Sequence, residues 1–243
     1  MPLYGSSTGK IYSLKMKNAG LFLLLVLNLS AFCQPKDADA MLGSLKRKYA
    51  GIRDYTVDAS VVVDVWFLNM PVKKAKIYYK YPDKVHVETK GFALLPKRAA
   101  SFDLGSFIGD KFTAFYMKSE NWGNSVMDVI KTIPNDASSD VILSTFWIDA
   151  KKMQIRKLEI NSKSGGTFQV ELDYNNLPKD LPQKMTVAFD VKEMNMPKGM
   201  TGEIPKKDKS DKSKEGRKGK VTITYSNYRV NMGIDDKVFK TTK

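Results

Sequence analysis

The chain has 243 residues and carries 40 Lys and Arg against 26 Asp and Glu, which gives a formal net charge of +14. It contains one cysteine and one histidine, which excludes an internal disulfide framework and any metal or catalytic site built from several thiolates or imidazoles. The excess of positive charge favours anionic surfaces or polyanions as partners and does not determine the fold.

The first predicted element is an N-terminal targeting segment. A mostly apolar run without charges, LFLLLVLNLSAF at 21–32, follows Lys15 and Lys17. It is shorter than the roughly 20 apolar residues that a membrane-spanning helix needs, and a basic start before a short apolar core is typical of a secretory signal peptide. We therefore predict a signal peptide at 16–33 and interpret 1–15 as an over-extended start.

The end of this segment defines the exported chain. Ala31, Phe32 and Cys33 form a variant of the small-x-small pattern that precedes a cleavage site. We expect cleavage before Gln34 and a single periplasmic domain at 34–243, which contains no cysteine and is stabilised by a hydrophobic core. The alternative is a lipoprotein anchored to the membrane through a lipid on Cys33. The bulky Phe32 disfavours it, because the residue before such a cysteine is normally small.

An amphipathic helix is predicted at the start of the exported domain. Asp37 stands where an N-cap is expected, and apolar residues follow it at the spacing of one helical face. This pattern predicts a helix over 37–50. The apolar residues of the face are Ala38, Met41, Leu42, Leu45 and Tyr49.

Most of the remaining chain is predicted to form β-strands. From Val57 to Phe67 the odd positions are apolar and polar residues interrupt the even ones, which is typical of a strand with one buried face. KSGGTF at 163–168 is predicted to be a hairpin turn. The regular repetition predicts one antiparallel sheet of seven or more strands, long enough to curl. The alternation returns in the stretches 77–87, 168–174, 185–191 and 221–225.

Two shorter helical segments complete the predicted elements. Apolar residues in 126–133 have helical spacing and Pro134 would end that helix, and another helical turn is expected near Phe107. Helices that lie across the concave side of a curled sheet would bury both apolar faces. The predicted fold is therefore mainly β, of the α+β class: a curled antiparallel sheet or half-barrel of seven or more strands, with short helices covering the concave face.

Residues 198–220 are a strongly basic segment, with nine Lys or Arg against four Asp or Glu. Almost no apolar residue follows Ile204, so we predict a flexible loop between two strands. The alternative is that 203–220 contacts anionic membrane headgroups or another polyanion. No aromatic residue is present to stack on bases, and we therefore expect no nucleic-acid partner.

Residues that could carry catalysis are few. His86 lies on the polar side of its predicted strand, and neither a second imidazole nor a cysteine in the exported chain is available to complete a Ser-His dyad or a zinc site. There is no Gly-rich phosphate loop. We predict that the protein is not an enzyme, with no metal and no cofactor. The acids, mostly at solvent-facing positions, are Asp54, Asp58, Asp64, Glu159, Glu171 and Asp173.

Three stretches carry a family resemblance. The helix at 37–50 precedes a long strand and then AKIYYKYPDKVHVE at 75–88. The stretch 144–174 has a Trp-x-Asp start, a charged strand, a Gly turn and a returning strand. The stretch 221–239 has a closing strand, an Asn and a short Asp-x-x-Phe end. Together they resemble the LolA-type lipoprotein carriers and their lipoprotein-sorting relatives, a group with a LolA/LolB/RseB-like fold.

The resemblance implies a half-barrel closed by a helical lid around an apolar cavity. Such a cavity accepts the acyl chains of lipoproteins or other lipids in the periplasm without covalent chemistry, and passes lipoproteins from an inner-membrane donor to an outer-membrane acceptor. We expect a monomer. In the carriers an Arg before a Pro bonds to the lid; here Tyr81 precedes Pro82, so Tyr81 and Lys80 are the candidate lid contact.

The candidate ligand-binding residues are the apolar side chains of the predicted inner face. Any sheet of this kind would bury the same positions, so core packing stays open as the alternative for each. For the whole protein, the alternatives to a carrier are an envelope-stress or lipid sensor and a basic surface or adhesion module. The candidate residues are Val61, Val63, Val65, Ile77, Tyr79, Tyr81, Val85, Val87, Phe168, Val170 and Val187.

Overall fold

Apart from Met1, the described residues begin at Lys36, just after the predicted signal peptide. The chain divides into two compact units, Met1–Pro35 and Lys36–Lys243, and all described elements belong to the second. The predicted signal peptide and most of the basic segment lie outside the described residues, as does the helical turn expected near Phe107, except for the helical and buried Ile108. No helix in the described part is long and apolar enough to span a membrane. The computed structural model describes Met1, 36–65, 68–89, 108, 111–174, 180–190 and 218–240.

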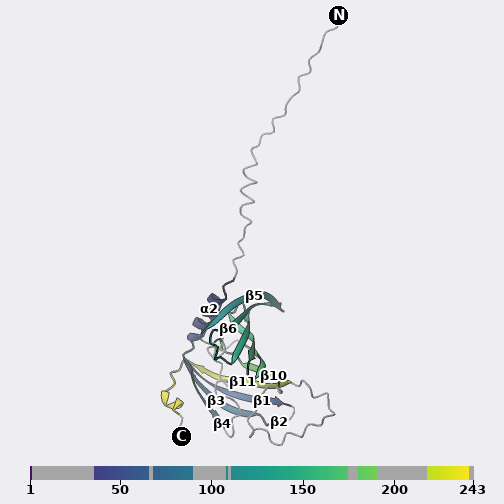
Figure 1. The fold of residues 1–243 in the computed structure, drawn as a ribbon. Helices are drawn as coiled ribbons and strands as arrows, with labels where there is room; N and C mark the ends of the chain where they lie inside the picture. Colours follow the sequence, from purple (N-terminus) through teal and green to yellow (C-terminus); the bar gives the residue numbers. More distant parts are fainter. Residues whose placement is uncertain are drawn as a thin grey trace, which may run out of the picture. The chain divides into compact units, whose positions relative to one another are not determined.

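One antiparallel sheet of eleven strands makes up most of this unit (Figure 1). The strands are β1 (Asp54–Val65), β2 (Leu68–Asn69), β3 (Lys73–Lys80), β4 (Lys84–Thr89), β5 (Phe112–Trp122), β6 (Ser125–Pro134), β7 (Val141–Asp149), β8 (Gln154–Ser162), β9 (Gly166–Asp173), β10 (Lys184–Asp190) and β11 (Lys218–Val230).

The strand order is β4-β3-β1-β11-β10-β9-β8-β7-β6-β5, and β2 pairs with β1. Strand β11 joins two runs of neighbouring strands, since it pairs with β1 on one side and with β10 on the other. Among the described residues β4 and β5 are the end strands and do not pair with each other. The predicted curled antiparallel sheet of seven or more strands is confirmed, and in the described part of the chain it is open.

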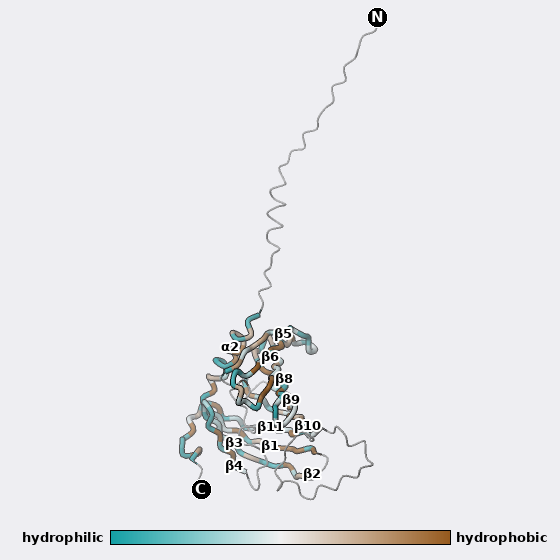
Figure 2. Tube along the Cα trace, in the orientation of Figure 1, coloured by the Kyte–Doolittle hydropathy of each residue, from teal (hydrophilic) through white to brown (hydrophobic). Residues whose placement is uncertain are grey.

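One face of the sheet is apolar because side chains alternate between its two faces. Along β1 the odd residues from Tyr55 to Val61 are buried and the even ones are only partly so. Figure 2 shows hydrophobic and hydrophilic residues interrupting one another along the strands. The inward residues of β1, β3 and β6 to β11 form one hydrophobic cluster, and this cluster is the core of the domain.

The predicted helix at 37–50 is confirmed as α2 (Ala38–Ala50). The Asp37 carboxylate accepts hydrogen bonds from the amides of Asp39 and Ala40, which satisfies two donors at the helix start. The helix buries one face in the core cluster, through Ala38, Leu42, Leu45 and Tyr49.

The helix predicted over 126–133 is wrong: these residues belong to β6. Strand β6 lies between β5 and β7 and buries side chains of both parities, among them Met127, Val129 and Ile130. A strand covered on both faces loses the alternation of polar and apolar residues and can imitate helical spacing. The β-branched residues favour the strand, and Pro134 ends it.

The turn predicted at 163–168 is confirmed. Strand β8 ends at Ser162 and β9 begins at Gly166, which has a φ of 69°. Glycine adopts this left-handed conformation without the steric cost that other residues meet.

Candidate functional site

The apolar face is completely buried across the middle of the sheet. Four side chains that are neighbours across β1, β11, β10 and β9 are each no more than 3% exposed. They pack as the closed core that a sheet of this size needs. The four residues are Val61, Ile223, Met185 and Leu172.

Beyond this row several side chains of the same face are less completely buried, although Val65 at the end of β1 is buried. The next residues on the same face of β1, β11 and β10 are Val63, Val221 and Val187, which are cross-strand neighbours and only partly buried. One step further, Phe189 of β10 lies opposite Phe168 of β9, and both are partly exposed. We call these five residues the apolar rim: Val63, Phe168, Val187, Phe189 and Val221.

The two phenylalanines of the apolar rim are held in place by each other and by a glycine. Their ring centroids are 6.4 Å apart with an interplanar angle of 44°. Phe189 also lies opposite Gly219 of β11, and a Cβ atom on Gly219 would come within 2.7 Å of Phe189 Cζ. The absence of a side chain at Gly219 therefore gives the Phe189 ring its position against the sheet.

The opposite end of the face is closed by tyrosines. The rings of Tyr55 and Tyr79 stack at 5.0 Å, and Tyr228 meets Tyr55 edge-on at 5.7 Å. Burial raises the pKa of Tyr49 to about 12 and also raises the pKa of Tyr225 and Tyr228 above the usual value for tyrosine. These phenols stay neutral at physiological pH, so this end of the interior carries no charge from them.

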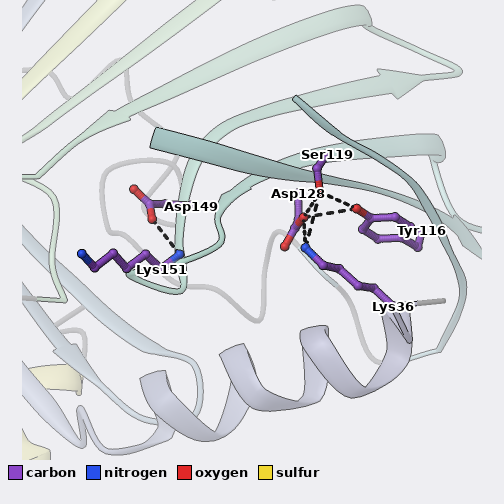
Figure 3. A network of polar contacts seen from close by, with 6 residues as sticks. All are labelled: Lys36, Tyr116, Ser119, Asp128, Asp149 and Lys151. Carbon is purple, nitrogen blue, oxygen red and sulfur yellow. Dashed lines mark hydrogen bonds and ion pairs between the residues drawn. The ribbon is translucent and has the colours of Figure 1, made fainter. Parts of the chain in front are cut away.

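Helix α2 is fixed to the sheet at its start by a polar network (Figure 3). Lys36 Nζ lies 2.6 Å from Asp128 Oδ1, on the inward side of β6. The same oxygen accepts hydrogen bonds from Ser119 Oγ at 2.7 Å and from the Tyr116 hydroxyl at 3.2 Å. Asp128 is only 2% exposed, and these three donors compensate the burial of its carboxylate.

The other end of α2 is fixed as well. Lys48 Nζ lies 2.8 Å from Asp180 Oδ1 and donates to the carbonyls of Lys152 and Met153, at 2.8 and 3.0 Å. The hydroxyl oxygens of Tyr49 and Tyr174 are 3.4 Å apart. Polar contacts at both ends therefore hold the helix over the apolar face.

The candidate lid contact lies beside the C-terminal segment. Lys80 Nζ donates to the Ile234 carbonyl at 2.9 Å and to Asp236 Oδ1 at 2.7 Å. Asp236 belongs to the short 3₁₀ helix η3 (Asp236–Phe239). Hydrogen bonds from Lys80, and then from Lys84, lower the pKa of the Asp236 carboxyl below its usual range. The Tyr81 side chain is 54% exposed. The role of Tyr81 and Lys80 in contacting a lid stays a prediction.

The predicted cavity residues fall into three groups by burial, and their contact with a ligand also stays a prediction. Residues of the first group are buried in the core, those of the second are partly buried, and Tyr81 alone is exposed. The buried ones are Val61, Val65, Ile77, Tyr79 and Val170, and the partly buried ones are Val63, Val85, Val87, Phe168 and Val187.

Two members of the apolar rim, Phe189 and Val221, are absent from the predicted site. Both are at apolar positions of alternating strands, so the sequence pattern places them on the inner face. The missing information is the register: Phe189 is recognised as a rim residue only once it is paired with Phe168 and Gly219.

The residues considered for chemistry are dispersed. His86 lies beside Tyr78, with 5.8 Å between ring centroids, and its Nε2 is 3.9 Å from Glu88 Oε1. No group of three His, Cys, Asp or Glu residues that could hold a metal occurs among the described residues. Asp54 departs from the expected solvent exposure: it is buried, and its carboxylate accepts hydrogen bonds from the amides of Met232 and Gly233.

Comparison with known proteins identifies the fold. No profile of a protein family and no curated protein sequence matches the chain. A putative outer membrane lipoprotein-sorting protein domain from Vibrio parahaemolyticus is 11% identical with a TM-score of 0.57, over 84% of this chain and 96% of that one. A DUF1329 family protein from Desulfovibrio piger is 11% identical with a TM-score of 0.57, over 85% and 98%. A LolA superfamily protein from Nitrosomonas europaea is 12% identical with a TM-score of 0.56, over 85% and 99%.

The open sheet with helix α2 packed on its apolar face thus has the same fold as these three structures. The similarity extends over nearly the whole length of each structure. The resemblance to LolA-type proteins predicted from the sequence motifs is confirmed at the level of the fold.

Proposed function

We propose that the protein binds acyl chains of lipids or lipoproteins on the concave apolar face of its sheet and carries them through the periplasm. The apolar rim is the observation that supports this proposal. Its valines and phenylalanines lie on the same strands as completely buried core residues, yet they remain partly exposed. An acyl chain that binds along the apolar rim would gain about 0.8 kcal/mol of favourable free energy for each methylene group removed from water.

The proposed activity is binding and release without covalent chemistry, so the protein is not an enzyme. The tyrosines at the far end carry no charge at physiological pH, and the rim is built from hydrocarbon side chains. Such an interior favours an apolar chain over a charged solute. The fold neighbours include a protein described as lipoprotein-sorting, which agrees with a lipidated cargo.

The proposed location and partners follow from the export signal and the cargo. A protein released by cleavage before Gln34 would shuttle between an inner-membrane donor and an outer-membrane acceptor as a monomer. Helix α2 would have to move, at least in part, to admit a chain to the buried middle of the face. Tyr81 and Lys80 are proposed to contact the covering segment in the closed state.

Native mass spectrometry of the exported protein tests the proposal. The protein is incubated with a synthetic triacylated lipopeptide or with palmitate, and a bound species of matching mass is expected. If neither probe binds and no lipid co-purifies with the protein, the proposed carrier function is refuted.

A pair of neighbouring substitutions then tests the surface. Val187→Lys places a charge on the apolar rim and is expected to lower the affinity for a fluorescent fatty acid by at least tenfold. Thr186→Lys places the same charge on the opposite face of β10 and serves as the matched control, with an expected change of less than twofold. Circular dichroism checks that both variants are folded. Equal effects of the two substitutions would exclude the apolar rim as the binding surface.

A further inference from the structure

The tip of the β5–β6 hairpin exposes apolar side chains. Gly123 and Asn124 form its two-residue turn, and on either side Trp122 is 40% exposed and Val126 is 44% exposed. Together with the neighbouring Val126, the Trp122 indole gives the tip an apolar end, and exposed apolar surface beside polar residues often marks an interaction site. Neither residue belongs to the hydrophobic core cluster or to the apolar rim.

Two exposed lysines lie beside this tip. The amide of Ala150 donates to the Val126 carbonyl at 2.9 Å, which brings the β7–β8 turn, with the exposed Lys151 and Lys152, beside the hairpin. Lys118 of β5 and Lys36 are also partly exposed, but they form ion pairs with Glu120 and Asp128. The cations beside the tip are therefore those of Lys151 and Lys152.

The acidic side chains of the same region face inward or are paired. Asp128 and Asp149 are only 2% and 3% exposed. Asp149 Oδ1 accepts a hydrogen bond from the amide of Lys151 (Figure 3) and another from the amide of Lys152. Glu120 accepts from Lys118 and from the Trp147 indole, at 2.6 and 2.8 Å. Since the ion pairs of Lys36 and Lys118 neutralise Asp128 and Glu120, the positive charge beside the tip comes from Lys151 and Lys152.

We propose that this tip docks the protein on an anionic lipid surface, with Trp122 and Val126 in the headgroup layer and the lysines against lipid phosphates. A lipid interface accepts an indole without a preformed pocket, because the ring has an apolar body and a polar N–H. Each lysine near an anionic surface adds about fivefold to the affinity. A lipid surface fits better than an acidic protein, because it offers an apolar layer for the exposed indole together with phosphates for Lys151 and Lys152.

The inference is independent of the acyl-chain site, because the tip shares no residue with the apolar rim. It also differs from the membrane contact predicted for 203–220. Loss of vesicle docking with retained fatty-acid binding would separate the two functions experimentally.

A labelling experiment tests the placement of the tip. In the full chain carrying Cys33→Ser, which leaves a small residue at the predicted cleavage position, a single cysteine is introduced as Asn124→Cys and labelled with an environment-sensitive dye. Vesicles of phosphatidylglycerol and phosphatidylethanolamine should shift its emission to the blue, and phosphatidylcholine vesicles should not. Ser164→Cys in the β8–β9 turn is the matched control and should give no shift. Equal shifts at both positions, or none at Asn124→Cys, overturn the proposal.

Vesicle co-sedimentation with variants tests the chemistry. Trp122→Ser should weaken binding to the phosphatidylglycerol vesicles by about tenfold, and the double variant Lys151→Glu, Lys152→Glu by at least 25-fold at low salt. Ile142→Ser, at a side chain that is 51% exposed on β7, and deletion of 203–218 should leave binding within twofold. Binding that survives Trp122→Ser but is lost on deletion of 203–218 would refute a role for the tip. Binding to poly-glutamate as tight as to vesicles would assign the tip to an acidic polypeptide instead, which also overturns the proposal.

Discussion

Lys36 and Asp128 lie 92 positions apart in the sequence, and their side chains meet at 2.6 Å. The pair joins the residue before helix α2 to the inward side of β6. The Asp128 carboxylate is almost completely buried. The free-energy cost of removing its charge from water must therefore be offset by the few donors around it.

We expect Lys36→Met to destabilise the domain by about 1–2 kcal/mol, because it removes a charged donor from a buried carboxylate that keeps two hydroxyl donors. Thermal unfolding followed by circular dichroism should show a fall in Tm of roughly 2–8 °C. Lys118→Met is the matched control: it breaks the pair with Glu120 at a more exposed position, and a much smaller fall in Tm is expected. A loss as large as that of Lys36→Met would show that burial of the acid is not what matters.

Gly219→Ala should destabilise the sheet by about 1–3 kcal/mol, because the new Cβ would overlap the Phe189 ring and force it off its position. Phe189→Leu in the same chain should recover part of the loss, since the shorter side chain leaves room for the methyl group. A double-mutant cycle in urea measures this coupling. Strict additivity of the two substitutions would mean that the ring does not meet position 219.

Asn231 has a left-handed backbone with a φ of 57°. Its side-chain oxygen accepts from the amide of Arg53, and its amide donates to the Gly51 carbonyl. Asn231→Ala removes these bonds and leaves a residue that resists this φ, so a loss of about 2–4 kcal/mol is expected. Asn231→Gly removes the bonds but tolerates the φ, and we expect it to be about 1 kcal/mol more stable than Asn231→Ala. Urea unfolding compares the two; the reverse order would contradict the backbone argument.

The buried tyrosines predict loss of stability in alkali. Their folded-state pKa values are raised by burial, so the folded chain keeps protons that the unfolded chain releases above about pH 10. The contribution is fully present below pH 10 and is lost as the pH rises toward 12. Tm measured from pH 8 to 11.5 should fall steeply above pH 10. Tyr49→Phe should make the fall shallower; an unchanged fall would contradict the role of this buried phenol.

The sequence predicts the faces of the strands better than their neighbours. Alternation from Val57 onward places the buried residues of β1, and the spacing of Leu42, Leu45 and Tyr49 places the buried side of α2. Strand β6 is not predicted because both of its faces are covered, so apolar and polar residues do not alternate along it. The Gly123-Asn124 pair between β5 and β6 is typical of the two-residue loop of a β-hairpin.

The candidate site is less predictable for a related reason. Which apolar positions form the closed core and which remain partly exposed depends on how far along each strand the cover extends, and alternation is the same in both cases. Val61 and Val63 have identical surroundings in the sequence pattern, yet only Val61 is buried. The contact between Lys36 and Asp128 likewise has no local signal, since it depends on the register of β5, β6 and β7.

The position of β11 has a consequence for how the chain reaches its native state. Of the described strands this one is the last in sequence, yet it lies between β1 and β10 and pairs with both. Without β11 the described strands form two separate sheets. In one, β1 pairs with β3 and β3 with β4; in the other, β5 through β10 pair in order, and both sheets have unpaired edge strands. A nascent chain that stalls before Lys218 therefore exposes these unpaired edges to chaperones and proteases.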